Sequence, residues 1–291
     1  MSKGLPQIKF KSKFPQISGI EILRLEGIAK RKSTLSHNPE RPHQANFYQL
    51  IIYTNGATEN LIDFVRYKAQ KKSLFYISIG QVYSFKFNPE IRGYVILFTE
   101  EYFKKQMNNL PNYTTLRLLA SHLFTPKTQI PINSNVLNYV NIMFDEFHKT
   151  GDSFNKKTTV DSLFTIILSK LEELKQEQTS YIRDSYKLRR FFQFHSLLKD
   201  NYTTSRNAEF YASQMNITYK YLNEICKEIT NSTSKQFIDE FILLEAKRQL
   251  TNSGIRSTDL AYRLGFNEPT NFIKYFKKHT GLTPNQFKNS L

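Results

Sequence analysis

The chain has 291 residues, which is enough for two ordinary domains that each bury a core. It carries 41 Lys and Arg against 25 Asp and Glu, a formal net charge of +16. Such a surplus favours a polyanionic partner, because basic side chains set against phosphates release condensed counterions, although a merely basic protein fits it equally well. The charge does not locate the partner, since the residues from Arg183 onward hold 17 basic and 10 acidic side chains.

Cysteine content and hydropathy exclude several classes of protein. One cysteine, Cys226, leaves no internal disulfide framework and suits a reducing cytoplasm, where we expect the protein to act. No apolar run approaches the roughly 20 residues that span a bilayer. The basic start of the chain lacks the apolar stretch of a secretory signal, so we expect no membrane association.

The first hundred residues are predicted to form β structure. Runs rich in aromatic and β-branched residues alternate with turn residues such as Asn55-Gly56, and cover 47–54, 61–67, 73–78 and 93–98. Strands at this spacing are typical of a sandwich or barrel, whose interior is either filled or holds one small ligand. Neighbours on a strand point to opposite faces, so the sequence leaves open whether Phe47 or Tyr48, and Phe75 or Tyr76, faces inward.

Beyond residue 100 the hydrophobic period becomes helical, over 116–123, 136–147 and 160–174. The last of these segments has an apolar stripe of Leu163, Ile166, Ile167, Leu171 and Leu174. The stripe packs either on its own domain or on a second subunit. The polar residues 175–180 are interpreted as the start of a linker.

An internal repeat covers residues 206–291. Ala212–Ile217 matches Ala261–Phe266 at an offset of 49 residues, and from Leu222 and Phe272 onward the offset is 50. In each copy a small Ala stands five residues before an apolar residue, which allows two helices to cross closely.

The glycine and asparagine positions of the repeat indicate turns. Asn216 and Asn231 of the first copy correspond to Gly265 and Gly281 of the second. These two residue types tolerate the left-handed conformation best, so we expect one to end a helix before a tight turn and the other to end the next helix. This is the pattern of a helix-turn-helix, and an unrelated pair of helical hairpins would rarely repeat all of it.

Capping residues predict where the second helix of each copy begins. Thr218 can cap a helix over 218–228, and Asn267 or Glu268 can cap one over 268–278 with Pro269 at its first position. Between the copies, Lys235–Leu250 has an uninterrupted helical pattern that spans about 24 Å. A rod of that length can hold two helices in successive major-groove turns, which lie ~34 Å apart.

Three segments of the second copy, Leu260–Phe266, Asn271–Lys278 and Thr280–Pro284, closely resemble the signature of AraC/XylS-type transcription regulators. The region before them resembles the cupin-like sensor domain of that family at Arg41-Pro-His43, and also at 47–48, 80–82 and 93–98. The resemblance implies an α+β fold in three parts. These are a cupin-like N-terminal β-barrel over 1–110, a helical segment for dimerisation over 111–181, and an all-α domain with tandem helix-turn-helix units over 182–291.

Three residues depart from the family pattern: Ser257, Cys226 and Ile242. Ser257 stands where the family usually has an apolar residue, Cys226 where it has Phe, and Ile242 where many members have Arg. We expect looser local packing around the first two, and Cys226 on the core side of its helix. None of them removes a position that faces DNA.

The resemblance and the exposed helix faces together assign residues to DNA. The base-reading set is Lys220, Asn223, Glu224, Thr270, Asn271 and Lys274, since Asn pairs with adenine, Lys donates to guanine and Glu accepts from cytosine. The phosphate set is Tyr219, Lys227, Lys277 and Lys278, whose contacts orient the protein without specifying sequence. Glu224 could instead form an ion pair with Lys220 one turn away.

The β domain offers His43, Phe47 and Phe75 as candidates for an effector site. We expect no metal and no cofactor, because the six histidines form no metal-ligand motif and His43, near a strand start, lacks a second His close by. We expect no enzyme, because the chain has no P-loop, no dinucleotide fingerprint and no GxSxG.

The sequence thus predicts a sequence-specific DNA-binding transcription regulator whose helices 218–228 and 268–278 enter successive major grooves. Its expected partners are double-stranded DNA, a small-molecule effector, a second copy of the chain and, for an activator, RNA polymerase. For the second copy we favour the Leu163–Leu174 stripe as the interface, because a DNA reader commonly needs a partner. The alternative is an architectural or repair-associated DNA-binding protein without effector sensing, which a promoter footprint would distinguish.

Overall fold

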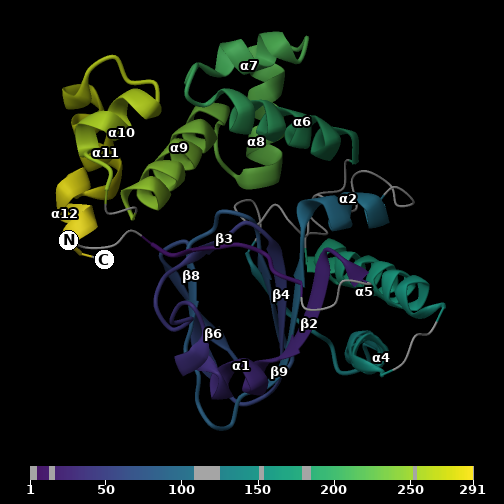
Figure 1. Ribbon diagram of the computed structural model, residues 1–291. Coiled ribbons are helices and arrows are strands. Elements are labelled where there is room, and N and C mark those ends of the chain that lie inside the picture. Colours follow the sequence, from purple (N-terminus) through teal and green to yellow (C-terminus); the bar gives the residue numbers. More distant parts are fainter. Residues whose placement is uncertain are drawn as a thin grey trace. The chain divides into compact units, whose positions relative to one another are not determined.

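A computed structural model describes residues 5–12, 17–107, 125–150, 154–178, 185–251 and 254–290. The chain divides into two compact units, over 6–180 and 181–291, which we describe separately (Figure 1). The helix expected over 116–123 lies outside the described residues. The α+β fold class is confirmed, with sheets in the first unit and helices alone among the described elements of the second.

The N-terminal unit contains two antiparallel sheets. The larger has the strand order β10-β7-β4-β9-β2 and is formed by β2 (Ile20–Arg24), β4 (Tyr48–Asn55), β7 (Ser73–Ile77), β9 (Arg92–Phe98) and β10 (Lys127–Gln129). The smaller has the order β6-β5-β8 and is formed by β5 (Thr58–Ile62), β6 (Val65–Ala69) and β8 (Tyr83–Phe85). A short parallel pair joins β1 (Gln7–Ile8) to β3 (Gln44–Ala45). The helices are α1 (Leu25–Lys30), the 3₁₀ turn η2 (Lys32–Thr34), α2 (Glu100–Met107), α4 (Val136–His148) and α5 (Lys156–Gln178).

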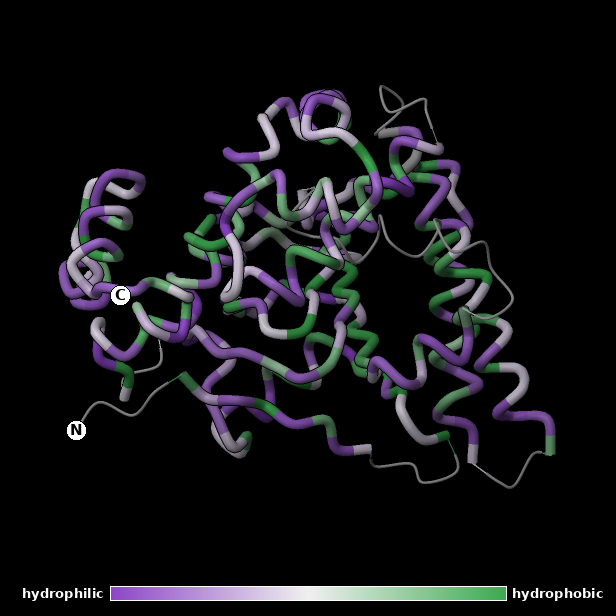
Figure 2. Tube along the Cα trace, turned by 90° about the horizontal axis from the view of Figure 1, so that it is seen from above, coloured by the Kyte–Doolittle hydropathy of each residue, from purple (hydrophilic) through white to green (hydrophobic). Residues whose placement is uncertain are grey.

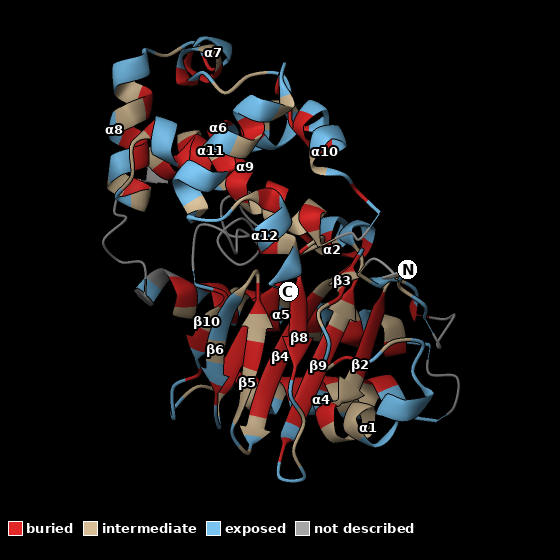
Figure 3. Cartoon of the chain, turned by 90° about the vertical axis from the view of Figure 1, so that its left-hand side faces the viewer, coloured by how far each residue is buried: buried red, intermediate tan, exposed pale blue. Residues whose placement is uncertain are grey.

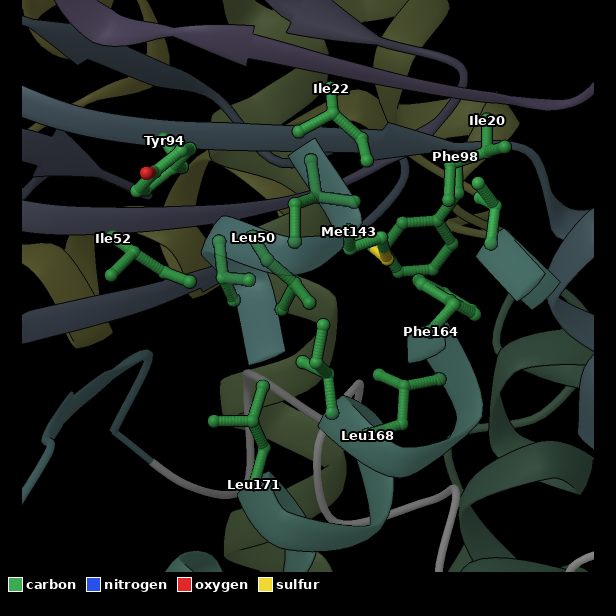
Figure 4. Close-up of a cluster of buried hydrophobic side chains, with 14 of the residues drawn as sticks. Ile20, Ile22, Leu50, Ile52, Tyr94, Phe98, Met143, Phe164, Leu168 and Leu171 are labelled. Atoms are coloured by element: carbon green, nitrogen blue, oxygen red, sulfur yellow. The ribbon is translucent and has the colours of Figure 1, made fainter. Parts of the chain in front are cut away.

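The larger sheet is buried on both faces, which explains its nearly continuous apolar strands (Figure 3). Along β4 the side chains alternate: Leu50 and Ile52 pack under the helices, whereas Ile51 and Tyr53 pack between the two sheets. Figure 4 shows the helix-side core, where strand residues meet Met143 of α4 and side chains of α5 such as Phe164.

The core between the sheets decides the two alternatives that the sequence left open. Phe47 and Phe75 belong to this inner core together with residues of the smaller sheet, while Tyr48 and Tyr76 belong to the helix side. The described strands form two facing sheets that are not hydrogen-bonded into one continuous barrel. The interior that the sequence predicted is therefore present, but between two layers.

The run 61–67 was predicted to be a single strand, and this is wrong. The chain reverses at Asp63 and Phe64, which both have positive φ, so the run splits into the β5–β6 hairpin. The Asp63 carboxylate accepts hydrogen bonds from the Val82 amide at 3.2 Å and from Gln81 at 2.6 Å, which stabilises a turn that contains no Gly.

The apolar stripe of α5 packs on its own sheet. Ile167 and Leu171 are fully buried in the helix-side core, and Leu163 and Leu174 pack against it, so Ile166 alone of the five is exposed. Of the two alternatives that the sequence left open for this stripe, the structure shows packing on its own domain.

Residues 175–178 also differ from the expected linker. They continue α5, and Lys175 is buried with its Nζ donating to the Thr125 carbonyl at 2.6 Å. Burial lowers the pKa of Lys175 to about 8.

The described elements of the C-terminal unit are seven helices. Hydrophilic and hydrophobic residues alternate along the helical parts of the chain (Figure 2). The seven helices are α6 (Ser185–Asn201), α7 (Ala208–Gln214), α8 (Tyr219–Thr230), α9 (Ser234–Leu250), α10 (Ser257–Arg263), α11 (Pro269–Thr280) and α12 (Pro284–Asn289). Helix α9 is the predicted rod between the two copies. It buries residues on several sides and contacts helices of both copies.

Candidate nucleic-acid interface

Helices α7 and α8 form the first helix-turn-helix. Asn216 has φ 53° after α7, and the Ile217 amide donates back to the Ala212 carbonyl at 3.0 Å, closing the tight turn. Thr218 caps α8 by accepting from the Tyr221 amide at 3.1 Å, as predicted. Asn231 ends α8 with φ 57°.

Helices α10 and α11 repeat this geometry. Gly265 has φ 74°, the Phe266 amide donates to the Ala261 carbonyl at 2.9 Å, and Gly281 ends α11 with φ 76°. Pro269 occupies the first turn of α11, as expected. The expected side-chain cap is missing, because Glu268 holds the N-cap position without a hydrogen bond from its side chain. The four left-handed residues predicted from the repeat are confirmed.

Both copies end in the same capping box. Thr233 accepts from the Gln236 amide while the Gln236 side chain accepts from the Thr233 amide, and Thr283 and Gln286 do the same at the start of α12. The structural repeat therefore extends beyond α8 and α11, the second helix of each copy, into the helix that follows each of them.

The buried side of α8 consists of Leu222, Ile225, Cys226 and Ile229, and that of α11 includes Phe272 and Phe276. Of the ten residues assigned to DNA from the sequence, nine are exposed: Tyr219, Lys220, Glu224, Lys227, Thr270, Asn271, Lys274, Lys277 and Lys278. Apolar periodicity alone allows either Tyr221 or Leu222 at the core position of α8, and in the structure Leu222 is fully buried whereas Tyr221 is only partly buried. Each helix thus presents a continuous polar face to solvent (Figure 3).

Asn223 is the exception among the assigned residues. Its Oδ1 accepts from the Ser234 amide at 2.9 Å and from the Ser234 hydroxyl at 3.3 Å. Ser234 is fully buried at the start of α9. The side-chain oxygen that adenine recognition would use is therefore already occupied within the protein.

The two exposed faces carry different charges. On α11 Lys274, Lys277 and Lys278 are exposed with no acidic residue on the helix, whereas on α8 Lys220 and Lys227 share the exposed face with Glu224. The alternative ion pair of Glu224 with Lys220 is absent among the described contacts. Electrostatic attraction to phosphates should consequently be stronger at α11.

Helix α11 is tied to α9 through a buried polar contact. The Tyr275 hydroxyl donates to Asp239 Oδ1 at 2.9 Å, and Lys235 Nζ lies 2.6 Å from the same oxygen. Burial, and next the negative charge of Asp239, raise the pKa of Tyr275 far above its ordinary value. The hydrogen bond between Tyr275 and Asp239 could not be predicted from the sequence, because the spacing of the two residues does not indicate that they lie in contact.

The second turn also packs against the loop before α7. The Arg206 guanidinium lies 3.7 Å from the centroid of the Phe266 ring, and a Cβ added to Gly265 would come within 1.9 Å of the Thr203 carbonyl oxygen. These contacts join the second helix-turn-helix to the segment that opens the first. Both helix-turn-helix motifs therefore pack within the same compact unit.

The three family departures have local explanations. Cys226 is fully buried, and burial raises the pKa of its thiol to about 12. Ser257 donates to Asn285 of α12 at 2.8 Å, so it joins two helices, and Ile242 is fully buried in α9.

In the N-terminal unit, His43 is buried beside the inner core. Its Nδ1 lies 2.8 Å from the Arg41 carbonyl, and its ring packs on Tyr83 with centroids 4.1 Å apart. Burial lowers the pKa of His43 to about 4. The sequence suggested no second His close by, yet His37 packs on His43 with centroids 4.5 Å apart. Within the described ranges, no group of three or more His, Cys, Asp or Glu side chains could hold a metal ion.

The chain is similar to several known proteins. Residues 211–290 match a family model described as "Helix-turn-helix domain". An HTH-type transcriptional regulator from the cgkA 5' region of Pseudoalteromonas carrageenovora is 33% identical over 93 residues, 32% of this chain and 55% of that protein. The activator RhaS of Mannheimia succiniciproducens is 20% identical over 251 residues, 86% and 89% of the two chains. ToxT from Vibrio cholerae O395 has 12% identity and a TM-score of 0.46, over 84% of this chain and 90% of that one.

The repeated geometry and the matched domain define a tandem helix-turn-helix DNA-binding protein. Within that class, the chain is similar to HTH-type transcriptional regulators, among them an activator that it matches along most of both chains. The chain spans about half the length of the first of these relatives, and both carry the names of transcriptional regulators. No helix in the described part of the chain combines the length and apolar character that a membrane crossing requires.

Proposed function

We propose that this regulator binds its operator by placing α8 and α11 in successive major-groove segments of one DNA face. Base contacts come from Lys220, Glu224, Thr270, Asn271 and Lys274, and phosphate contacts from Tyr219, Lys227, Lys277 and Lys278. The observation that carries this proposal is the duplicated helix-turn-helix geometry joined by α9, whose 17 residues give a rod of about 25 Å.

The operator should be asymmetric within each half-site. The exposed residues of α8 and α11 differ at every assigned reading position, so the two segments should have unrelated sequences. A symmetric repeat inside one half-site would argue against this mode of binding.

The proposal is tested by selecting bound sequences from random duplexes and then footprinting the protein on the most enriched sequence. We expect two protected major-groove segments about one helical turn apart on the same face. Uniform protection, or preference for damaged or bent DNA, would instead support the architectural or repair-associated alternative.

We propose further that the inner core of the N-terminal unit is the effector site, with His43, Phe47 and Phe75 at its lining. Buried uncharged polar groups support this: Gln49 donates to the Tyr83 hydroxyl, and the Tyr53 hydroxyl donates to Asn60 at 2.9 Å. A thermal-shift screen of small metabolites tests it. A hit counts only if it also changes the affinity for the operator, because coupling between two sites is reciprocal.

The remaining partners are proposals as well. We propose that the chain acts in the cytoplasm as a homodimer and that it contacts RNA polymerase if it activates transcription. The α5 stripe packs largely within its own unit, so we propose that other surfaces contribute to the dimer interface. Light scattering of the full chain with and without operator DNA measures the oligomeric state directly.

A further inference from the structure

The internal repeat shows which position of α8 corresponds to each position of α11. Lys220 matches Thr270 and Glu224 matches Lys274, so two pairs of assigned readers are in register. The two assigned asparagines are not: Asn271 matches Tyr221, and Asn223 matches Ile273. A base-reading role for both asparagines would require the two helices to read DNA from different faces.

The partner of Asn223 changes in the same way between the copies. Asn223 accepts the hydrogen bond of the Ser234 amide, and the residue that corresponds to Ser234 in the second copy is Pro284. A proline has no amide hydrogen, so the second copy needs no acceptor there and carries Ile273 in place of Asn. The polar pair of one copy is replaced by an apolar pair in the other.

The backbone around the two pairs is otherwise the same. Thr233 before Ser234 has φ −67° and ψ 158°, and Thr283 before Pro284 has φ −72° and ψ 158°. Both values are compatible with a following proline. Ser234 and Pro284 are both buried, and each begins the helix that follows a reading helix.

From these observations, and on the basis of the proposed function, we infer that Asn223 is a positioning residue and not a base reader. Its Oδ1 satisfies the buried Ser234 amide, which fixes α8 against the start of α9 and so sets the angle at which α8 meets DNA. A buried amide without an acceptor is strongly destabilising, which explains why this copy keeps an Asn. The reading face of α8 then consists of Lys220, Tyr221 and Glu224, the counterparts of Thr270, Asn271 and Lys274.

Transplanting the apolar pair of the second copy into the first tests this inference. The full chain is prepared as wild type, Asn223→Ile, Ser234→Pro and the double variant. Asn223→Ile leaves the Ser234 amide without its acceptor, and Ser234→Pro removes both donors from Asn223. We expect each single change to lower the thermal midpoint by about 5 °C and the double variant to recover most of that loss. Strictly additive losses would overturn the positioning role.

Sequence selection with the same proteins separates positioning from reading. We expect the double variant to select the same bases as the wild type, and Tyr221→Ala to relax preference at one position by about tenfold. Loss of an adenine preference in the double variant would show that Asn223 reads a base, and an unchanged profile for Tyr221→Ala would remove Tyr221 from the reading face. If the wild type selects no sequence at all, the proposed function fails, whereas the thermal cycle still decides the role of Asn223.

Discussion

The Tyr275 hydroxyl on the second reading helix donates a hydrogen bond to the buried carboxylate of Asp239 on the connecting helix, across 2.9 Å. The two residues are 36 positions apart, and Lys235 lies on the other side of the same carboxylate. This contact fixes α11 to the rod that also contacts α8. The relative placement of the two reading helices therefore depends on a group that does not itself face DNA.

Tyr275→Phe should uncouple the two reading helices. We expect a loss of ~1–3 kcal/mol in the free energy of unfolding, because a hydrogen bond to a buried charged group is removed. Affinity for an operator with both segments should fall about tenfold, a change that corresponds to ~1.4 kcal/mol, while affinity for a single segment should stay the same. Tyr262→Phe on exposed α10 is the control, and equal losses for both variants would contradict the idea.

Gly265 and Gly281 should respond differently to the same substitution. Both have left-handed φ, and the first copy carries Asn at both positions, but a Cβ at Gly265 meets the Thr203 carbonyl oxygen whereas nothing lies within 4 Å at Gly281. Gly281→Asn should cost less than ~1 kcal/mol of stability. Gly265→Asn should cost ~1–3 kcal/mol or more through overpacking. Urea unfolding of both variants measures this, and equal stabilities would mean that the Thr203 contact is unimportant.

Asn271→Ala should change sequence preference. The side chain is exposed on α11, and its loss should cost ~1–3 kcal/mol on the selected operator while random duplex is bound as before. Titrations of both duplexes at one salt concentration provide the measurement. An equal loss on the two duplexes would assign Asn271 to the phosphates instead.

Lys277→Ala should weaken binding to all DNA. A residue that contacts a phosphate contributes about 0.9 to the slope of log affinity against log salt, so the slope should fall by roughly 1. The matched control is Lys170→Ala, because Lys170 lies in the other unit and pairs with Glu173. A slope that does not change in Lys277→Ala would remove this residue from the interface.

The N-terminal unit should lose stability in mild acid through His43. Burial lowers the pKa of His43 from 6.5 to about 4. Between these two pH values the imidazole is therefore protonated in the unfolded chain but stays neutral in the folded chain. Stability should therefore fall between pH 6.5 and 4, by an amount of order 3 kcal/mol at the acid end. His43→Asn keeps a donor toward the Arg41 carbonyl without this titration, and should flatten the curve. Exposed His279→Asn is the control, and parallel curves for wild type and His43→Asn would refute the assignment.

Some features of this protein follow from local sequence. The left-handed Asn and Gly residues, the Thr caps and the apolar spacing each depend on neighbours within a few positions. The repeat therefore predicted both helix-turn-helix units, and the apolar spacing between the copies predicted α9. The helices α4 and α5 could be predicted for the same reason. The run 61–67 could not, because Asp63 and Phe64 turn the chain with the support of Gln81 and Val82, which are distant in sequence.

Tertiary structure decided the questions that depend on which surface meets which. The helical spacing of apolar residues shows that α5 has an apolar stripe. Only the tertiary packing shows that this stripe meets the sheet of its own unit. Likewise, the sequence identifies Asn223 as a polar residue on a reading helix, but the buried amide of Ser234 beside it exists only once α9 has folded against α8. Local spacing fixes the elements, whereas hydrogen bonds and burial between distant segments decide which of their side chains remain available for DNA.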